Sequence, residues 1–242
     1  MDLDFLEIGT SDFDTLCQTC SDQEFGMSVE PIKYYLDRLP ERSNVIKVQV
    51  AISNKSGAVK VYYVPDENIK TYNLPSFVRG CNSINNYHPQ VVELLQSSGI
   101  NNVDQVIQND EVDVLTYGDL MNMYNIQSIK HLKIDTEGHD LIILESMLEY
   151  LQPNPEKRPR KITFESNVLH DRTNVANMIL TLMDQGYTVV SSRQDTVLEY
   201  APGNSFRPWP LATFLMFWPE TNLARHGANL RSALLSPLVR YV

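Results

Sequence analysis

The chain is dominated by an alternation of short apolar runs and longer segments with helical signals. Six runs predict strands: residues 3–8, 25–30, 45–52, 131–135, 161–166 and 187–191. Helices are predicted at residues 31–39, 118–125, 140–151 and 174–185, and Ser11 or Asp12 can cap a further helix after the first strand. Helices placed in this way join parallel strands. The sequence therefore predicts an α/β fold, in which helices cover both faces of a mostly parallel sheet.

Residues 65–110 interrupt this alternation. The segment is rich in Asn, Ser and Pro, with one predicted helix near residues 89–97, and it lies between extended segments at 58–64 and 112–116. Irregular stretches of this length are uncommon in compact domains. We therefore expect an insert or lid at 65–110 within a single domain spanning residues 1–242. Because the first strand begins almost at Met1, a further hypothesis is that the chain is a domain cut from a longer protein, fused there to other domains.

Composition excludes several classes of protein. The chain of 242 residues is 43% hydrophobic, which suits one folded domain. Thirty acidic and 20 basic side chains leave a net charge of −10, which disfavours nucleic acid as a partner. No run approaches the roughly 18 apolar residues of a membrane span. The first ten residues lack the features of a signal peptide, and three cysteines suit reduced thiols, so we expect a cytoplasmic location.

Acidic residues stand at the carboxyl ends of four of five predicted strands. Glu7 lies at the first end, Glu30 at the second, Asp135 and Glu137 at the fourth, and Glu165 at the fifth. Open α/β sheets bind ligands at these ends. A pyrophosphate needs a glycine-rich turn without nearby anions, which disfavours NAD and FAD. The acids instead favour a ligand that carries positive charge.

The first turn and the second strand suggest what else that ligand contains. Gly9 allows the backbone to approach a ligand closely. Glu30 follows this turn by about 20 residues, the spacing at which an acid accepts the hydroxyls of a ribose. The acids at the first and fourth strands suit an ammonium and a sulfonium group. S-adenosylmethionine combines all these parts and is the predicted cofactor. Plainer structural roles are open for each acid, since Asp135 could cap a turn and Glu30 could sit beside a helix dipole.

The segments EIGT, SVEP, VAIS and LKIDTEGHDLIIL, in this order, closely resemble the FkbM-type methyltransferases. That family consists of class I S-adenosylmethionine-dependent O-methyltransferases, and the resemblance covers about residues 4–200. It implies a Rossmann-like class I methyltransferase fold, with a seven-stranded sheet whose last strand is antiparallel. Residues 212–218 are the candidate for that strand. One departure is Phe13, which stands where the family's first loop usually has a second glycine.

The resemblance also implies roles for individual residues. Those that would line the methionine part of the cofactor are Glu7, Gly9, Thr10 and Ser11. Glu30 would hold the ribose, and Ala51 and Ile52 would flank the adenine. Asp135 would face the methionine end and the transferred methyl group, while Glu137, Gly138 and Asp140 would shape the acceptor side.

Methyl transfer to an alkyl hydroxyl also needs a group that removes a proton. Asp135 is the first candidate for this base, and Glu137, His139 and Glu165 compete with it. Clustered carboxylates could also hold a divalent metal, although the sequence specifies no metal ligands, and the C-x-x-C of Cys17 and Cys20 is expected to lie in the core. His88 and His170 lie in polar segments and are predicted to be surface residues, although either could reach the acceptor.

Three functions follow in order of preference. The first is an O-methyltransferase acting on a hydroxyl of a sugar, glycan or polyketide-like acceptor. The second is a binding module that keeps this fold without catalysis, for which Phe13 is the motive. The third is a nucleotide-sugar or dinucleotide enzyme, which would need phosphate-binding glycines that the chain does not show.

Overall fold

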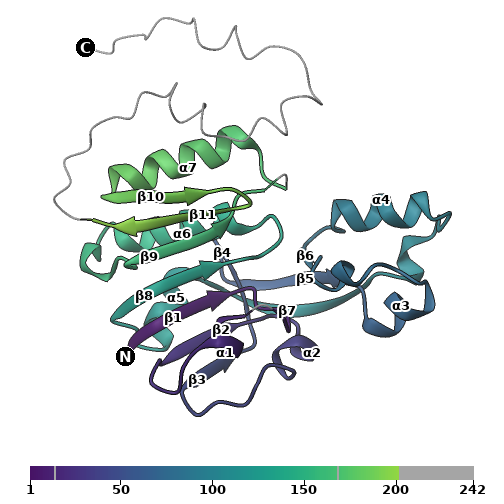
Figure 1. Cartoon of the computed structure of the whole chain (residues 1–242), viewed down its shortest axis with the longest axis horizontal. Coiled ribbons are helices and arrows are strands. Elements are labelled where there is room, and N and C mark those ends of the chain that lie inside the picture. The colour runs from purple at the N-terminus through teal and green to yellow at the C-terminus, as the bar shows by residue number, and fades with distance from the viewer. Residues whose placement is uncertain (14, 168, 202–242) are drawn as a thin grey trace, which may run out of the picture. The chain divides into compact units, whose positions relative to one another are not determined.

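The computed structural model describes residues 1–13, 15–167 and 169–201, and the larger of its two sheets confirms the predicted α/β class (Figure 1). The strands of this sheet, in spatial order, are β10 (Tyr187–Ser192), β11 (Asp195–Tyr200), β9 (Lys161–Glu165), β8 (Ser128–Ile134), β1 (Asp2–Ile8), β2 (Gly26–Val29) and β3 (Val45–Val48). The pairs from β9 to β3 are all parallel. The sheet is therefore seven-stranded and mostly parallel.

The described sheet contains one antiparallel strand, β11. β11 runs antiparallel to both β10 and β9, whereas residues 212–218 lie outside the described part of the chain. Thr196 and Leu198 of β11 are fully buried and alternate with more exposed neighbours. This period-two pattern is the local signal that could have identified the strand.

Helices occupy the connections, as predicted. They are α1 (Leu16–Thr19), α2 (Lys33–Leu36), α5 (Tyr117–Met123), α6 (Asp140–Leu151) and α7 (Arg172–Asp184), with a short 3₁₀ helix, η3 (Pro155–Lys157). The predicted bounds of α6 are confirmed. α2 is shorter than the predicted 31–39. The cap of α1 is Thr15 rather than Ser11 or Asp12, because the Thr15 hydroxyl accepts from Gln18 N at 3.1 Å and completes a capping box.

The predicted strand at 45–52 is in fact two strands in different sheets. β3 ends at Val48, and β4 (Ala51–Ser53) pairs in parallel with β7 (Gln108–Thr116) in a smaller sheet. That sheet has the order β4, β7, β5 (Gly57–Tyr63) and β6 (Ser83–Ile84). Residues 45–52 read as one mostly apolar run, and such a run does not reveal a change of pairing partner. The two strands were therefore predicted as one.

The segment at 65–110 is folded rather than irregular. It contains α3 (Asp66–Thr71), η1 (Ser76–Arg79), β6, α4 (Pro89–Ser97) and η2 (Val103–Gln105), and the bounds of α4 match the predicted helix. α3 and α4 lie beyond one end of the smaller sheet (Figure 1). Val78, Leu95 and Val106 are fully buried in a hydrophobic cluster that comes almost wholly from this segment, with Val64 just before it. The segment thus has its own small core, and a lid function stays a prediction.

Cysteine placement in the core is confirmed. Cys17, Cys20 and Cys81 are all free and buried, and Cys17 packs with Leu36 and Leu39 beneath the α1 and α2 side of the sheet. Within the described residues, no helix combines the length and the apolar character needed to cross a membrane.

Candidate active site

The candidate site begins where β1, β2 and β8 end side by side. Gly9 N donates to Val29 O at 2.9 Å, and Asp135 N donates to Ile8 O at 2.9 Å, so the three strand ends are tied to one another. Gly9 has a φ of +79°, which favours glycine. A Cβ at this position would lie 2.0 Å from the backbone oxygen of Asp135. The turn after β1 therefore passes directly against the end of β8, as close as a residue without a side chain allows.

A pocket opens at these ends and brings together eight of the ten predicted site residues. They are Gly9, Thr10, Ser11, Glu30, Ala51, Ile52, Asp135 and Glu137. Further walls come from Phe13, Val50 and Val61, and from Gly80, Asn82, Ser83 and Ile84 of the inserted segment. The smaller sheet and the insert thus close a pocket that the larger sheet begins. Glu7 and Glu165 do not line it.

The charged residues that line the pocket are Glu30, Asp135 and Glu137. In the described chain, no Lys, Arg or His contributes to this wall. Three carboxylates without a basic partner in the same wall attract a cation and repel a phosphate. The pocket therefore suits a positively charged ligand and opposes a diphosphate.

Backbone strain gathers at the same place. Among the described residues, Ser11 and Glu137 are the only ones other than Gly and Asn with a positive φ, at 46° and 52°. Both line the pocket. Such conformations cost about 1–3 kcal/mol each and are typical of functional sites. The hydroxyl of Ser11 is also buried without a hydrogen-bond partner.

Glu30 links the two loops on the β2 side of the pocket. Its Oε2 accepts from Ser11 N at 2.8 Å and from Thr10 N at 3.2 Å, and its Oε1 accepts from Ile32 N at 2.9 Å. The side chain is almost wholly buried. Burial raises the pKa of Glu30 to about 7, although the three backbone N–H groups oppose this rise. Of the roughly four acceptor positions of a carboxylate, one therefore remains for a ligand hydroxyl, on Oε1.

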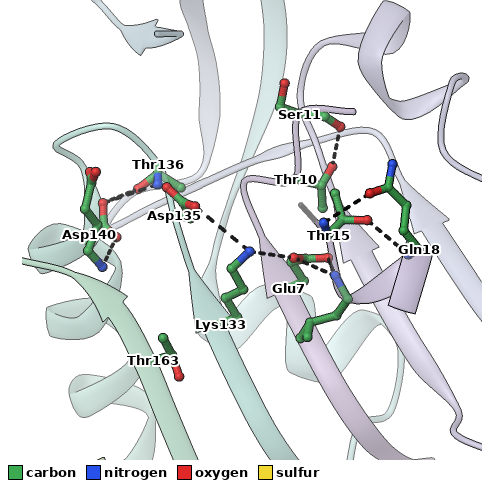
Figure 2. A network of polar contacts seen from close by, with 12 residues as sticks. Glu7, Thr10, Ser11, Thr15, Gln18, Lys133, Asp135, Thr136, Asp140 and Thr163 are labelled. Atoms are coloured by element: carbon green, nitrogen blue, oxygen red, sulfur yellow. Dashed lines mark hydrogen bonds and ion pairs between the residues drawn. The ribbon is translucent and has the colours of Figure 1, made fainter. Parts of the chain in front are cut away.

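Glu7 does not line the pocket and instead links the elements that surround it. Its two carboxylate oxygens each lie 3.0 Å from Leu16 N, at the start of α1. Lys133 Nζ, from β8, donates to Glu7 Oε1 at 3.1 Å and lies 4.0 Å from Asp135 Oδ2 (Figure 2). Glu7 has no exposed surface, and burial raises its pKa despite Lys133. The methionine contact implied for Glu7 is therefore replaced by a buried ion pair that joins β1, β8 and α1.

Replacing Lys133 with methionine is expected to lower the free energy of unfolding by about 3–5 kcal/mol, since it leaves Glu7 buried without its cation. Lys130→Met is the matched control, because Lys130 lies on the same strand with 67% of its side chain exposed and its pairing with Asp4 is worth about 1 kcal/mol or less. Urea denaturation at pH 8 measures both. Equal losses in the two variants would contradict the buried pair, and adding Glu7→Gln to Lys133→Met should recover much of the loss.

Phe13, which stands where the family usually has a glycine, forms part of the pocket wall, and the pocket remains open. Phe13 is a lining residue with 41% of its surface exposed, and the guanidinium of Arg79 lies 5.1 Å from the centre of its ring. Beside it, Asp12 is neutralised by Arg38 Nε at 2.6 Å and Arg79 at 3.1 Å. The acid of this loop is therefore occupied within the protein, a pairing that no local pattern indicated.

The predicted catalytic acids meet at the ends of β8 and β9. Asp135, Glu137 and Glu165 each offer an oxygen within 4.8 Å of the others. Burial, with the nearby carboxylates of Asp140 and Glu137, raises the pKa of Asp135 to about 7, yet 45% of its side chain is exposed. Burial and the same group of acids raise the pKa of Glu165 to about 9. Asp135 is thus the acid that combines access to the pocket with a pKa near neutrality.

Two histidines predicted at the surface are buried beside these acids. His88 is 2% exposed and its Nε2 lies 3.2 Å from Glu137 Oε2. His170 is 9% exposed and its Nε2 lies 3.6 Å from Asp140 Oδ2. Acids from other parts of the chain lie beside both imidazoles, but only that of His88 is within hydrogen-bond distance of its acid. His139, by contrast, is engaged with Ser53 at 2.9 Å, and burial lowers its pKa.

A comparison with known proteins identifies the family of the chain. The model of the Methyltransferase FkbM domain matches residues 12–189, well over half of the chain. Searches of curated proteins and of solved structures gave no match. The matched range begins in the loop after β1 and includes Glu30, Ala51, Ile52, Asp135, Glu137 and Glu165. The chain therefore belongs to the FkbM methyltransferase family.

Proposed function

We propose that the protein is an S-adenosylmethionine-dependent O-methyltransferase that acts on a hydroxyl of a sugar, glycan or polyketide-like acceptor. The observation that carries this proposal is a pocket whose charged wall residues are all carboxylates, at strand ends where Gly9 allows close approach. The strand order, with one antiparallel strand among parallel ones, also fits the Rossmann-like sheet of class I methyltransferases. The sugar or glycan class of the acceptor rests on the family alone.

The residues present fit the cofactor. Glu30 would accept from a ribose hydroxyl, and the apolar side chains of Ala51 and Ile52 would flank the adenine. The turn of Gly9, Thr10 and Ser11 would hold the methionine part, with the unpartnered Ser11 hydroxyl available as a donor or acceptor. When bound, S-adenosylmethionine supplies a methyl group activated on a sulfonium.

The protein's own contribution would be alignment and removal of a proton. Alignment of two reactants is worth up to roughly 7–11 kcal/mol, and a general base adds about 10²–10⁴-fold. Asp135 would accept the proton of the acceptor hydroxyl, because its carboxylate opens to the pocket and its pKa of about 7 suits a base at neutral pH. Glu165, with a pKa of about 9 and no place in the wall, is less suited to that step.

Two other functions remain as alternatives. A non-catalytic binding module would bind S-adenosylmethionine weakly or not at all, and Phe13 in the wall is its motive. A dinucleotide or nucleotide-sugar enzyme is opposed by the acidic wall, which would repel a diphosphate. The proposed partners are accordingly small hydroxyl compounds or glycans rather than nucleic acid, and we keep the proposal of a cytoplasmic location.

Calorimetry with S-adenosylhomocysteine tests the cofactor assignment. We expect Glu30→Gln to weaken binding by about 10–100-fold, the worth of a hydrogen bond to a charged group. Affinity for the unaltered protein should rise as the pH rises through about 7, because the ionised carboxylate of Glu30 is the form that accepts from a ribose hydroxyl. The contribution of Glu30 to the stability of the ligand-free fold is expected to fall over the same range, from about pH 4.5 to about 7, because its folded pKa is raised.

The matched control is Glu67→Gln, an exposed acid on α3 outside the pocket, which should leave affinity and its pH dependence unchanged. No binding at millimolar ligand, or tighter binding of NAD or a nucleotide-sugar in the same assay, would contradict the proposal. In thermal denaturation, a ligand at about 100 times its Kd should add roughly 2.7 kcal/mol of stability.

A further inference from the structure

A second group of ligating atoms lies behind the pocket, at the starts of α6 and α7. Asp140 is the first residue of α6, Glu165 is the last of β9, and His170 immediately precedes the Asp171 cap of α7. Each offers one oxygen or nitrogen atom within 4.8 Å of the other two. Three ligands on one metal ion lie at such separations, since metal–ligand distances are about 2.0–2.3 Å.

The imidazole of His170 gives an independent observation that points to a ligand. Its side chain is only 4% exposed, and Nε2 has no hydrogen-bond partner. This atom is directed at the carboxylate of Asp140, 3.6 Å away. Glu165 Oε2 is likewise buried without a partner. Buried polar atoms are normally paired, so two unpaired atoms in one group call for a common partner.

The carboxylate of Asp140 is already held in a fixed orientation. Its Oδ2 accepts from Thr136 Oγ1 at 2.8 Å and from Thr136 N at 3.3 Å (Figure 2), and its Oδ1 accepts from Glu165 N at 3.1 Å. Outer contacts of this kind orient metal ligands in known sites. A carboxylate offers about four acceptor positions, so one remains free, on Oδ1.

Negative charge accumulates around this group. The group includes Glu165, whose carboxylate is repelled by those of Glu137, Asp140, Asp135 and Asp195. Among the described ion pairs, the cation on Asp135 is Lys133, at 4.0 Å. Lys133 also forms a shorter ion pair with Glu7, at 3.1 Å. A divalent cation would offset the repulsion among these acids and would also bond to the unpaired nitrogen and oxygen.

We propose that Asp140, Glu165 and His170 bind one divalent transition-metal cation of the Mn²⁺ or Zn²⁺ type. Two carboxylates and one imidazole suit these ions, whereas Mg²⁺ and Ca²⁺ prefer oxygen ligands alone. A groove between α6 and α7 is lined by Gly138, Leu169 and His170 among others, so one of the three proposed ligands borders it. The inference does not rest on the proposed function, although the site adjoins Asp135 and Glu137 through Glu165.

Titration of the chelator-treated chain with Mn²⁺ tests the site. Binding is measured as the loss of the electron paramagnetic resonance signal of free Mn²⁺. We expect one ion per chain, and we expect His170→Gln and Glu165→Gln each to weaken binding at least about 10–100-fold. Circular dichroism checks that the variants are folded. Glu145→Gln is the control, because Glu145 is exposed in the same groove but lies outside the ligand group, and it should leave the affinity unchanged.

The inference is overturned if neither Mn²⁺ nor Zn²⁺ binds at millimolar concentration. It is also overturned if both ligand variants keep the unaltered affinity, or if Mg²⁺ binds as tightly as Mn²⁺. Titration of the metal-free chain with S-adenosylhomocysteine separates this inference from the proposed function. Binding of that compound without metal binding would remove the metal site alone, and metal binding without that compound would remove the cofactor assignment alone.

Discussion

Replacing Gly9 with alanine is expected to lower the free energy of unfolding by more than about 3 kcal/mol and to abolish binding of S-adenosylhomocysteine. The left-handed backbone at this position costs an L-residue about 1–2 kcal/mol, and the added Cβ would also lie 2.0 Å from Asp135 O and 2.8 Å from Asp135 C. These are backbone atoms, tied by the hydrogen bond from Asp135 N to Ile8 O. The overlap can be relieved only by parting β1 from β8, where the pocket begins.

Gly99→Ala is the matched control for this clash. Gly99 has the same φ of +79°, but a Cβ there would meet no heavy atom within 4 Å. It should therefore cost only the conformational term, about 1–2 kcal/mol, and should leave ligand affinity unchanged. Urea denaturation and calorimetry measure both variants. If Gly9→Ala cost no more than Gly99→Ala, the close contact between the two strand ends would be refuted.

Asp135→Asn is expected to lower kcat by about 10²–10⁴-fold, the usual contribution of a general base, while the fold is retained. The substitution keeps the shape of a side chain that is 45% exposed, so few packing contacts are lost. The affinity for S-adenosylhomocysteine should change by less than about tenfold, because that compound lacks the sulfonium charge that the carboxylate would face. Formation of S-adenosylhomocysteine, with whichever sugar acceptor the unaltered enzyme methylates, gives the rate.

Asp113→Asn on β7 is the control, since Asp113 is exposed and does not line the pocket. Its kcat should match that of the unaltered protein. A turnover of Asp135→Asn within a factor of two of that value would remove Asp135 from its proposed role. Loss of affinity with an unchanged kcat would instead make it a binding residue.

Features that depend on near neighbours in the chain were predictable. The bounds of α6 and α4 follow from apolar periodicity and from local start signals such as Pro89. The acids at the ends of β1, β2, β8 and β9 were identified because parallel strands of one sheet end at a common edge. The same rule predicts that Gly9, Glu30 and Asp135 lie close together, and all three line the pocket.

Features that depend on distant partners were not predictable. Nothing local marks Val48 as the last residue paired with β2 and Ala51 as the first paired with β7. The two arginines that neutralise Asp12 lie about 26 and 67 residues further along the chain, and the acid beside His88 is 49 residues away. Such pairings offset the charge of each residue, so that charge cannot be judged from its neighbours in the chain alone.

Local periodicity and the common edge of parallel strands thus specify from the amino-acid order which residues can meet a ligand here. They cannot specify which acid lines the pocket and which forms an ion pair inside the protein. Glu7 and Glu30 both stand at strand ends, yet one is buried against Lys133 and the other lines the pocket. The difference arises because burial and charge pairing depend on side chains that come together only when the whole sheet is assembled.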